Sequence, residues 1–137
     1  MKLVFKGKVL TDLRHKPLKD YDMVPSTDDP EKDEPQEIDM TMDRVVPVML
    51  ENAAGIDPQK AHRMARKIRD GGSLETTKQD RDLICQAVRT AAVKNMQGQD
   101  VFNNLHKGQI LDEIDDQIEA ARIAAKTSTD EKESEEE

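Results

Sequence analysis

The chain has 137 residues, a formal net charge of −8, 36% charged residues and 35% hydrophobic residues, a size that suits one domain and is too small for two ordinary ones. Two Phe and one Tyr are the only aromatic residues, so the core must use aliphatic side chains and Met, which favours helices over extensive sheets. A single cysteine, Cys85, excludes an internal disulfide, and the absence of a long apolar run excludes a membrane-spanning segment.

The negative charge is concentrated in two segments. Residues 28–39 hold seven acidic residues and one Lys, and residues 130–137 hold six acidic residues and one Lys. These segments together carry −11, so the rest of the chain carries +3 of the total of −8. Acidic segments usually stay solvated. We therefore predict a single small domain over residues 1–126, with a mobile acidic linker at about residues 25–39 and a disordered tail at residues 127–137.

The first residues alternate in the manner of a β-strand, with Leu3, Phe5 and Val9 on one face. Polar residues and a Pro at residues 11–18 indicate a turn, and a second short strand is expected near residues 18–21. An isolated hairpin is marginally stable in water. We therefore expect the apolar face of this N-terminal β-hairpin to pack on helices.

Two helices are expected next along the chain. The first covers residues 42–54, and its beginning is ambiguous because Pro47 is tolerated only in the first turn of a helix. The second begins after the N-cap Asp57, has Pro58 at its first position and ends at Gly71-Gly72. Its apolar residues recur every three or four positions, which predicts one buried stripe: Ala61, Met64, Ala65 and Ile68.

A third helix is expected after Thr76 or Thr77, and Thr76 with Gln79 would form a capping box. Its buried face is predicted to contain Leu83, Ile84, Ala87, Val88 and Ala91. The helical pattern restarts near Phe102, is interrupted at Gly108 and then runs from about residue 109 to residue 126.

The last helix carries an apolar stripe whose members are three and four residues apart: Leu111, Ile114, Ile118, Ala121 and Ala125. This spacing could pair the helix with a second copy of the chain or with a partner helix. The stripe is short and ends in alanines, which favours packing within the monomer.

A second candidate surface is the polar face of the second helix, which carries Lys60, Arg63, Arg66, Lys67 and Arg69. Such a face could bind an acidic protein, nucleic-acid phosphates or the acidic tail of the chain itself. A solvated helix face is the simpler interpretation. Nucleic acid ranks below a protein partner because the chain lacks aromatic residues for stacking and is negative overall.

No set of residues points to catalysis. His15, His62 and His106 have no metal-ligand spacing with one another or with Cys85. The Gly71-Gly72 pair lacks the Lys-Ser/Thr of a phosphate-binding loop, and the acidic segments lack the pattern of a calcium loop. We therefore predict a protein that is not an enzyme, with no metal and no cofactor.

Several segments together resemble small, functionally uncharacterised proteins of tailed bacteriophages and prophages. The opening KLVFKGKVLTDLRHKPLKD is similar to the start of that group, and MTMDRVVPVMLENA is similar to its first helix. AHRMARKIRDGG, SLETTKQDRDLICQAV and LHKGQIL continue the similarity, which spans about residues 2–111. Pro47 and the C-terminal extension depart from the pattern. The resemblance implies a viral protein that acts in the bacterial cytoplasm or in the virion, and it carries over no functional residues.

The expected fold is α+β and mostly helical, with an N-terminal β-hairpin packed on three or four helices. The predicted core comprises Leu3, Phe5, Val9, Val45, Met49, Leu50, Met64, Ile68, Leu83, Ile84, Val88, Phe102, Ile110 and Ile114. The leading hypothesis for function is a phage accessory protein that binds a host or phage protein, with modulation of a host enzyme as one role. The alternatives are a virion morphogenesis factor, such as a tail or head assembly chaperone or a minor structural protein, and a nucleic-acid-binding protein. Self-association is compatible with each of them, and no membrane partner is expected.

Overall fold

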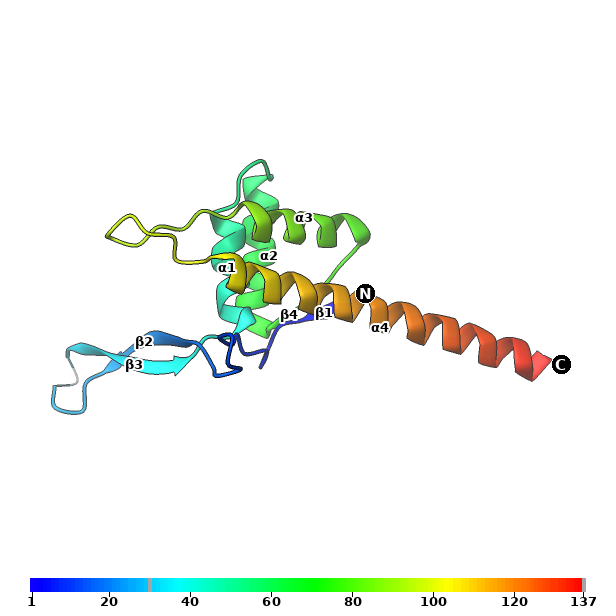
Figure 1. Cartoon of the computed structure of the whole chain (residues 1–137), viewed down its shortest axis with the longest axis horizontal. Coiled ribbons are helices and arrows are strands. Elements are labelled where there is room, and N and C mark those ends of the chain that lie inside the picture. The colour runs from blue at the N-terminus through cyan, green and yellow to red at the C-terminus, as the bar shows by residue number, and fades with distance from the viewer. Residues whose placement is uncertain (30, 137) are drawn as a thin grey trace.

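The computed structural model describes the backbone of residues 1–29 and 31–136 and the side chains of residues 1–29 and 31–126. Over this part, four helices and two small antiparallel sheets make an α+β fold that is mostly helical, as predicted. The elements in chain order are β1 (Lys2–Val4), β2 (Lys19–Pro25), β3 (Asp33–Asp39), α1 (Met42–Glu51), α2 (Pro58–Gly71), β4 (Ser73–Glu75), α3 (Lys78–Thr90) and α4 (Asn104–Glu136). The β2–β3 ribbon and the C-terminal part of α4 project from the helical body in opposite directions (Figure 1).

The core joins α1, α2, α3 and the first turns of α4 to β1 and β4, and most of the predicted core residues are buried in it. The prediction that Val9 belongs to the core is wrong, because Val9 is only half-buried and its neighbour Leu10 is fully buried instead. Gly7, at φ 75°, forms a turn after Phe5 that shifts the alternation by one residue. Leu83 is also half-buried and packs at the edge of the core.

The N-terminal hairpin is present, but its strands pair differently from the prediction. The turn at residues 11–18 brings Leu18 to Leu10, whose carbonyl accepts a hydrogen bond from the Leu18 amide at 2.8 Å. β1 instead pairs with β4, with Leu3 opposite Leu74. Gly72 extends this contact, because its carbonyl accepts hydrogen bonds from the two amides that follow β1. The partner of the first strand is therefore the segment after α2.

Part of the predicted acidic linker has regular structure, because residues 33–39 form β3 and pair with β2 in a continuous register from Lys19↔Asp39 to Pro25↔Asp33. Backbone hydrogen bonds hold such a ribbon together and do not require apolar side chains. Both strands are edge strands, where proline is tolerated. Met40 anchors the base of the ribbon, since its amide donates to the Leu18 carbonyl and its carbonyl accepts from the Leu10 amide, each at 2.8 Å.

The boundaries of α2 agree with the prediction. The Asp57 carboxylate accepts a hydrogen bond from the Lys60 amide, Pro58 is the first helical residue, and Gly72 closes the helix in the left-handed conformation at φ 72°. α1 is three residues shorter than predicted and includes Pro47 in its interior. Thr41 occupies the N-cap position of α1 without a hydrogen bond from its side chain to the helix.

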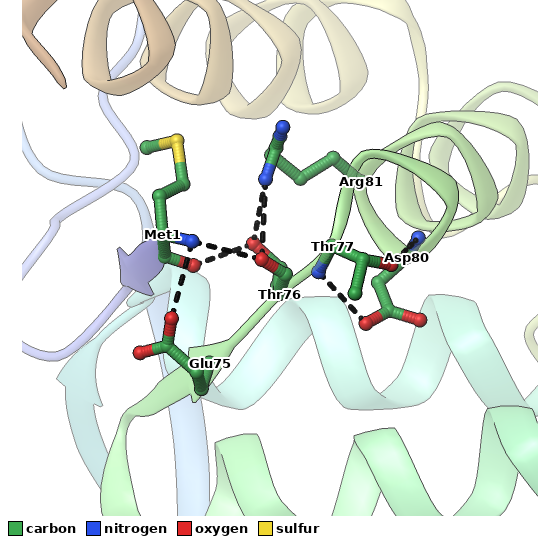
Figure 2. A network of polar contacts seen from close by, with 6 residues as sticks. All are labelled: Met1, Glu75, Thr76, Thr77, Asp80 and Arg81. Atoms are coloured by element: carbon green, nitrogen blue, oxygen red, sulfur yellow. Dashed lines mark hydrogen bonds and ion pairs between the residues drawn. The ribbon is translucent and has the colours of Figure 1, made fainter.

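The capping box of α3 lies one residue later than predicted (Figure 2). The Thr77 hydroxyl accepts from the Asp80 amide at 3.2 Å, and the Asp80 carboxylate accepts from the Thr77 amide at 2.9 Å. Thr76 has a different role, because it is buried and its hydroxyl donates to the Met1 carbonyl at 2.7 Å. Arg81 completes this contact by donating to the Thr76 carbonyl at 3.2 Å.

We expect Thr77→Ala to lower the free energy of unfolding by about 1 kcal/mol, because it removes the side-chain acceptor at the start of α3. Gln79→Ala is the matched control, since Gln79 is exposed and takes no part in the box. Its effect should stay within about 0.5 kcal/mol. Urea unfolding of both variants measures the difference, and a larger loss for Gln79→Ala than for Thr77→Ala would place the box at Thr76 and Gln79.

α4 is longer than predicted at both ends. It begins at Asn104, passes through Gly108 and continues to Glu136. The predicted disordered tail at residues 127–137 overlaps its last turns, whose side chains lie outside the described part of the structure. Ile114 is fully buried, and Leu111 and Ile118 pack against the core. The helix therefore has an anchored first half and a projecting second half (Figure 1).

Candidate protein-binding groove between α1 and α2

Of the five predicted cations of α2, one forms an ion pair with another helix. The Lys60 ammonium group lies 2.9 Å from the carboxylate of Asp80 in α3. The Thr77 amide, followed by Lys60, lowers the pKa of Asp80 from its ordinary value. The Lys60–Asp80 pair therefore links α2 to the start of α3, and Lys60 is not part of an open basic surface.

The other four cations remain exposed. Arg63, Arg66, Lys67 and Arg69 form what we call the basic face of α2, and none of them makes an ion pair with a described side chain. On a helix these positions surround the side opposite the buried Ala61 and Ile68. The basic face is therefore open to a partner along its length.

One edge of the basic face borders a groove of about 350 Å³ between α1 and α2. Buried and half-buried apolar side chains line it, namely Pro47, Val48 and Ala65. Arg66 and Arg69 stand beside these apolar residues from the α2 side. The remaining lining residues are Arg44, Glu51, His62 and Asp70. The groove thus combines an apolar floor with two unpaired guanidinium groups.

The groove continues toward the base of the β2–β3 ribbon. A neighbouring hollow, also about 350 Å³, is lined by Asp20, Asp43, Arg44, Val48 and Arg69. The Arg44 guanidinium lies 3.5 Å from the Asp20 carboxylate and 3.9 Å from that of Asp22. Arg44 therefore holds the ribbon against α1 and forms one end of the groove. The helical pattern of α2 could not identify Arg44, because this residue belongs to a different helix.

The apolar stripe of α4 is largely used within the monomer. Ile114 is fully buried, Leu111 and Ile118 pack on the core, and Ala121 is half-exposed. The stripe thus binds the chain's own helices over most of its length, which leaves the groove between α1 and α2 as the stronger candidate for a partner.

The histidines and the cysteine do not come together. His106 packs edge-on against Phe102, with ring centroids 5.5 Å apart, and burial lowers its pKa. Cys85 lines a hollow of about 660 Å³ between α3 and α4. Burial raises the pKa of its thiol, which keeps the thiol protonated and weakly nucleophilic at neutral pH. His62 lies on α2, 3.7 Å from the Glu51 carboxylate.

Within residues 1–29 and 31–126, no group of three or more His, Cys, Asp or Glu side chains is placed to hold a metal ion. No helix in the described part is both long and apolar enough to cross a membrane. No protein-family model matches the chain, and neither does any curated protein or solved structure. The groove and its charges are therefore the features of the molecule that bear on its function.

Proposed function

We propose that the protein is a non-catalytic accessory protein that binds an acidic segment of another protein in the groove between α1 and α2. One observation carries this proposal: the unpaired guanidinium groups of Arg66 and Arg69 stand beside the apolar floor formed by Pro47 and Val48. A peptide with carboxylates beside an apolar side chain would satisfy both parts of the groove.

The acids around the groove favour a protein over a nucleic acid. Glu51 and Asp70 line the groove together with the arginines, and Asp20 and Asp43 line its continuation. A nucleic-acid backbone carries phosphates at regular short intervals, so some of them would meet these carboxylates. A peptide can place its acidic residues opposite the arginines alone.

The resemblance to phage proteins supports a partner from the bacterial host or from the phage itself, and modulation of a host enzyme is the leading role. A virion morphogenesis role is the second candidate. The projection of the β2–β3 ribbon and of α4 in opposite directions favours it, because such a shape can contact two neighbouring subunits at once (Figure 1).

The test is affinity capture from nuclease-treated bacterial lysate with three versions of the full chain: unchanged, Arg66→Glu/Arg69→Glu, and Arg14→Glu/Lys16→Glu. The third version is the control, because it makes the same change in charge at exposed positions of the loop at residues 11–18. We expect the unchanged chain and the control to retain the same protein in stoichiometric amount and the groove variant to lose it, since like charges at an interface oppose binding strongly.

Two outcomes would contradict the proposal. If the groove variant retains the protein as well as the control does, the basic face of α2 is only a solvated surface. If the unchanged chain instead binds duplex DNA with an affinity that falls steeply with salt, and the groove variant does not, the face is a nucleic-acid site.

A further inference from the structure

The β2–β3 ribbon has one face that nothing in the described structure covers. Residues directly opposite one another in an antiparallel pair share a face, so Tyr21 lies beside Glu37 and Met23 beside Pro35. The side chains of Tyr21 and Met23 are 62% and 59% exposed, which is high for large apolar residues. We call this side, which includes Asp33, the outer face of the ribbon.

The opposite side of the ribbon faces α1. Asp20 and Asp22 belong to it, and both carboxylates approach the Arg44 guanidinium. These contacts hold the outer face away from the helices of its own chain. A two-stranded ribbon without a second layer is marginally stable in water, so covering the outer face would stabilise it.

The outer face and the groove between α1 and α2 are complementary. The outer face presents apolar side chains next to Glu37 and Asp33, neither of which makes an ion pair with a described side chain. The groove presents an apolar floor next to Arg66 and Arg69, which are equally unpaired. Each surface therefore has the charge and the apolar area that the other lacks.

The two surfaces are also neighbours. Asp20 at the base of the ribbon and Arg44 line the continuation of the groove, so the ribbon starts where the groove ends. Neighbouring complementary surfaces suit a two-fold axis, because one rotation places each ribbon on the other copy's groove.

We propose that two copies of the chain form a symmetric dimer in which the outer face of each ribbon lies in the α1–α2 groove of the other copy. Tyr21 and Met23 then cover the apolar floor, and Glu37 and Asp33 pair with Arg66 and Arg69. The dimer uses the groove assigned above to a partner protein but does not depend on that assignment. Where both hold, dimerisation and partner binding compete.

The test is a charge exchange measured by analytical ultracentrifugation of the purified full chain. The unchanged chain should show a concentration-dependent equilibrium between monomer and dimer. Asp33→Arg/Glu37→Arg and Arg66→Glu/Arg69→Glu should each raise the dimer Kd by about tenfold or more, because like charges then face one another. An equimolar mixture of the two variants should form a heterodimer, because opposite charges then face one another in both of its contacts. The unchanged ribbon of one variant meets the unchanged groove of the other, and the Arg-substituted ribbon meets the Glu-substituted groove.

Asp112→Arg/Asp116→Arg is the matched control, since both residues are exposed on α4 away from the ribbon and the groove. It should leave the dimer Kd unchanged. A monomer at every concentration of the unchanged chain would overturn the dimer, and so would a dimer that neither charge exchange weakens. Lysate capture with Asp33→Arg/Glu37→Arg keeps the two proposals separate, because this variant retains an intact groove and should still bind the partner protein.

Discussion

Replacing Gly72 with Ala is expected to lower the free energy of unfolding by about 2–4 kcal/mol, a large fraction of the stability of a small domain. Gly72 has φ 72°, where an L side chain is strained, and an added Cβ would lie 2.4 Å from the Cβ of Lys6. The Gly72 carbonyl also accepts hydrogen bonds from the amides of Phe5 and Lys6 at 2.8 and 2.9 Å. Relieving the clash would therefore loosen the contact between α2 and the N-terminal strand.

Two other glycines separate the contributions to this loss. Gly98 has φ 77° and nothing within 4 Å of an added Cβ, so Gly98→Ala should cost only the strain of the backbone, about 1–2 kcal/mol. Gly71 has no positive φ, and nothing lies within 4 Å of an added Cβ. Gly71→Ala should therefore leave the free energy of unfolding unchanged or raise it slightly. Urea unfolding of the three variants gives the comparison. An equal loss in Gly72→Ala and Gly98→Ala would mean that the approach of Lys6 is not a constraint.

Ile114→Ala is expected to lower the free energy of unfolding by about 2–5 kcal/mol, because it removes a fully buried side chain and leaves a cavity where α4 meets the core. Ile123, on the same helix, is 55% exposed. Ile123→Ala should therefore change the free energy of unfolding by less than about 0.5 kcal/mol. The comparison measures how far along α4 the packing on the body extends.

Urea unfolding of the two isoleucine variants, performed on the Arg66→Glu/Arg69→Glu background in which the proposed dimer is weakened, makes this comparison with the contribution of dimerisation reduced. Equal losses in the two would contradict the structure, because they would require the projecting half of α4 to be as well packed as its first half.

Local signals in the sequence were sufficient for α2. Asp57, Pro58 and Gly72 act through hydrogen bonds and backbone preferences within a few residues of the helix ends. The buried stripe of Ala61 and Ile68 also follows from helical periodicity alone. These features were predictable because both their cause and their effect lie inside one segment.

The start of α3 shows where local signals stop being sufficient. Thr76 and Thr77 can each serve as an N-cap residue, and each has a residue three positions later that could complete a capping box. The choice depends on Met1, whose carbonyl accepts the Thr76 hydroxyl 75 residues away in the chain. Packing against β1 buries Thr76 and leaves Thr77 to cap the helix.

The strands were less predictable than the helices. β1 has three residues, and its partner β4 follows α2 directly, so no local pattern links them. β3 consists largely of acidic and other polar residues, a composition that also occurs in disordered segments. Its structure rests on backbone hydrogen bonds to β2 and on the anchor at Met40. Such bonds are independent of side-chain hydrophobicity, which is the property that composition reports.

The candidate site divides in the same way. The sequence alone determined that α2 is amphipathic and carries its cations on one side, because helical geometry places residues three and four positions apart together. Only the tertiary structure decided that Lys60 pairs with α3 while Arg66 and Arg69 border a groove with α1. Packing brings distant elements together, and those neighbours determine which charges are neutralised and which remain available to bind.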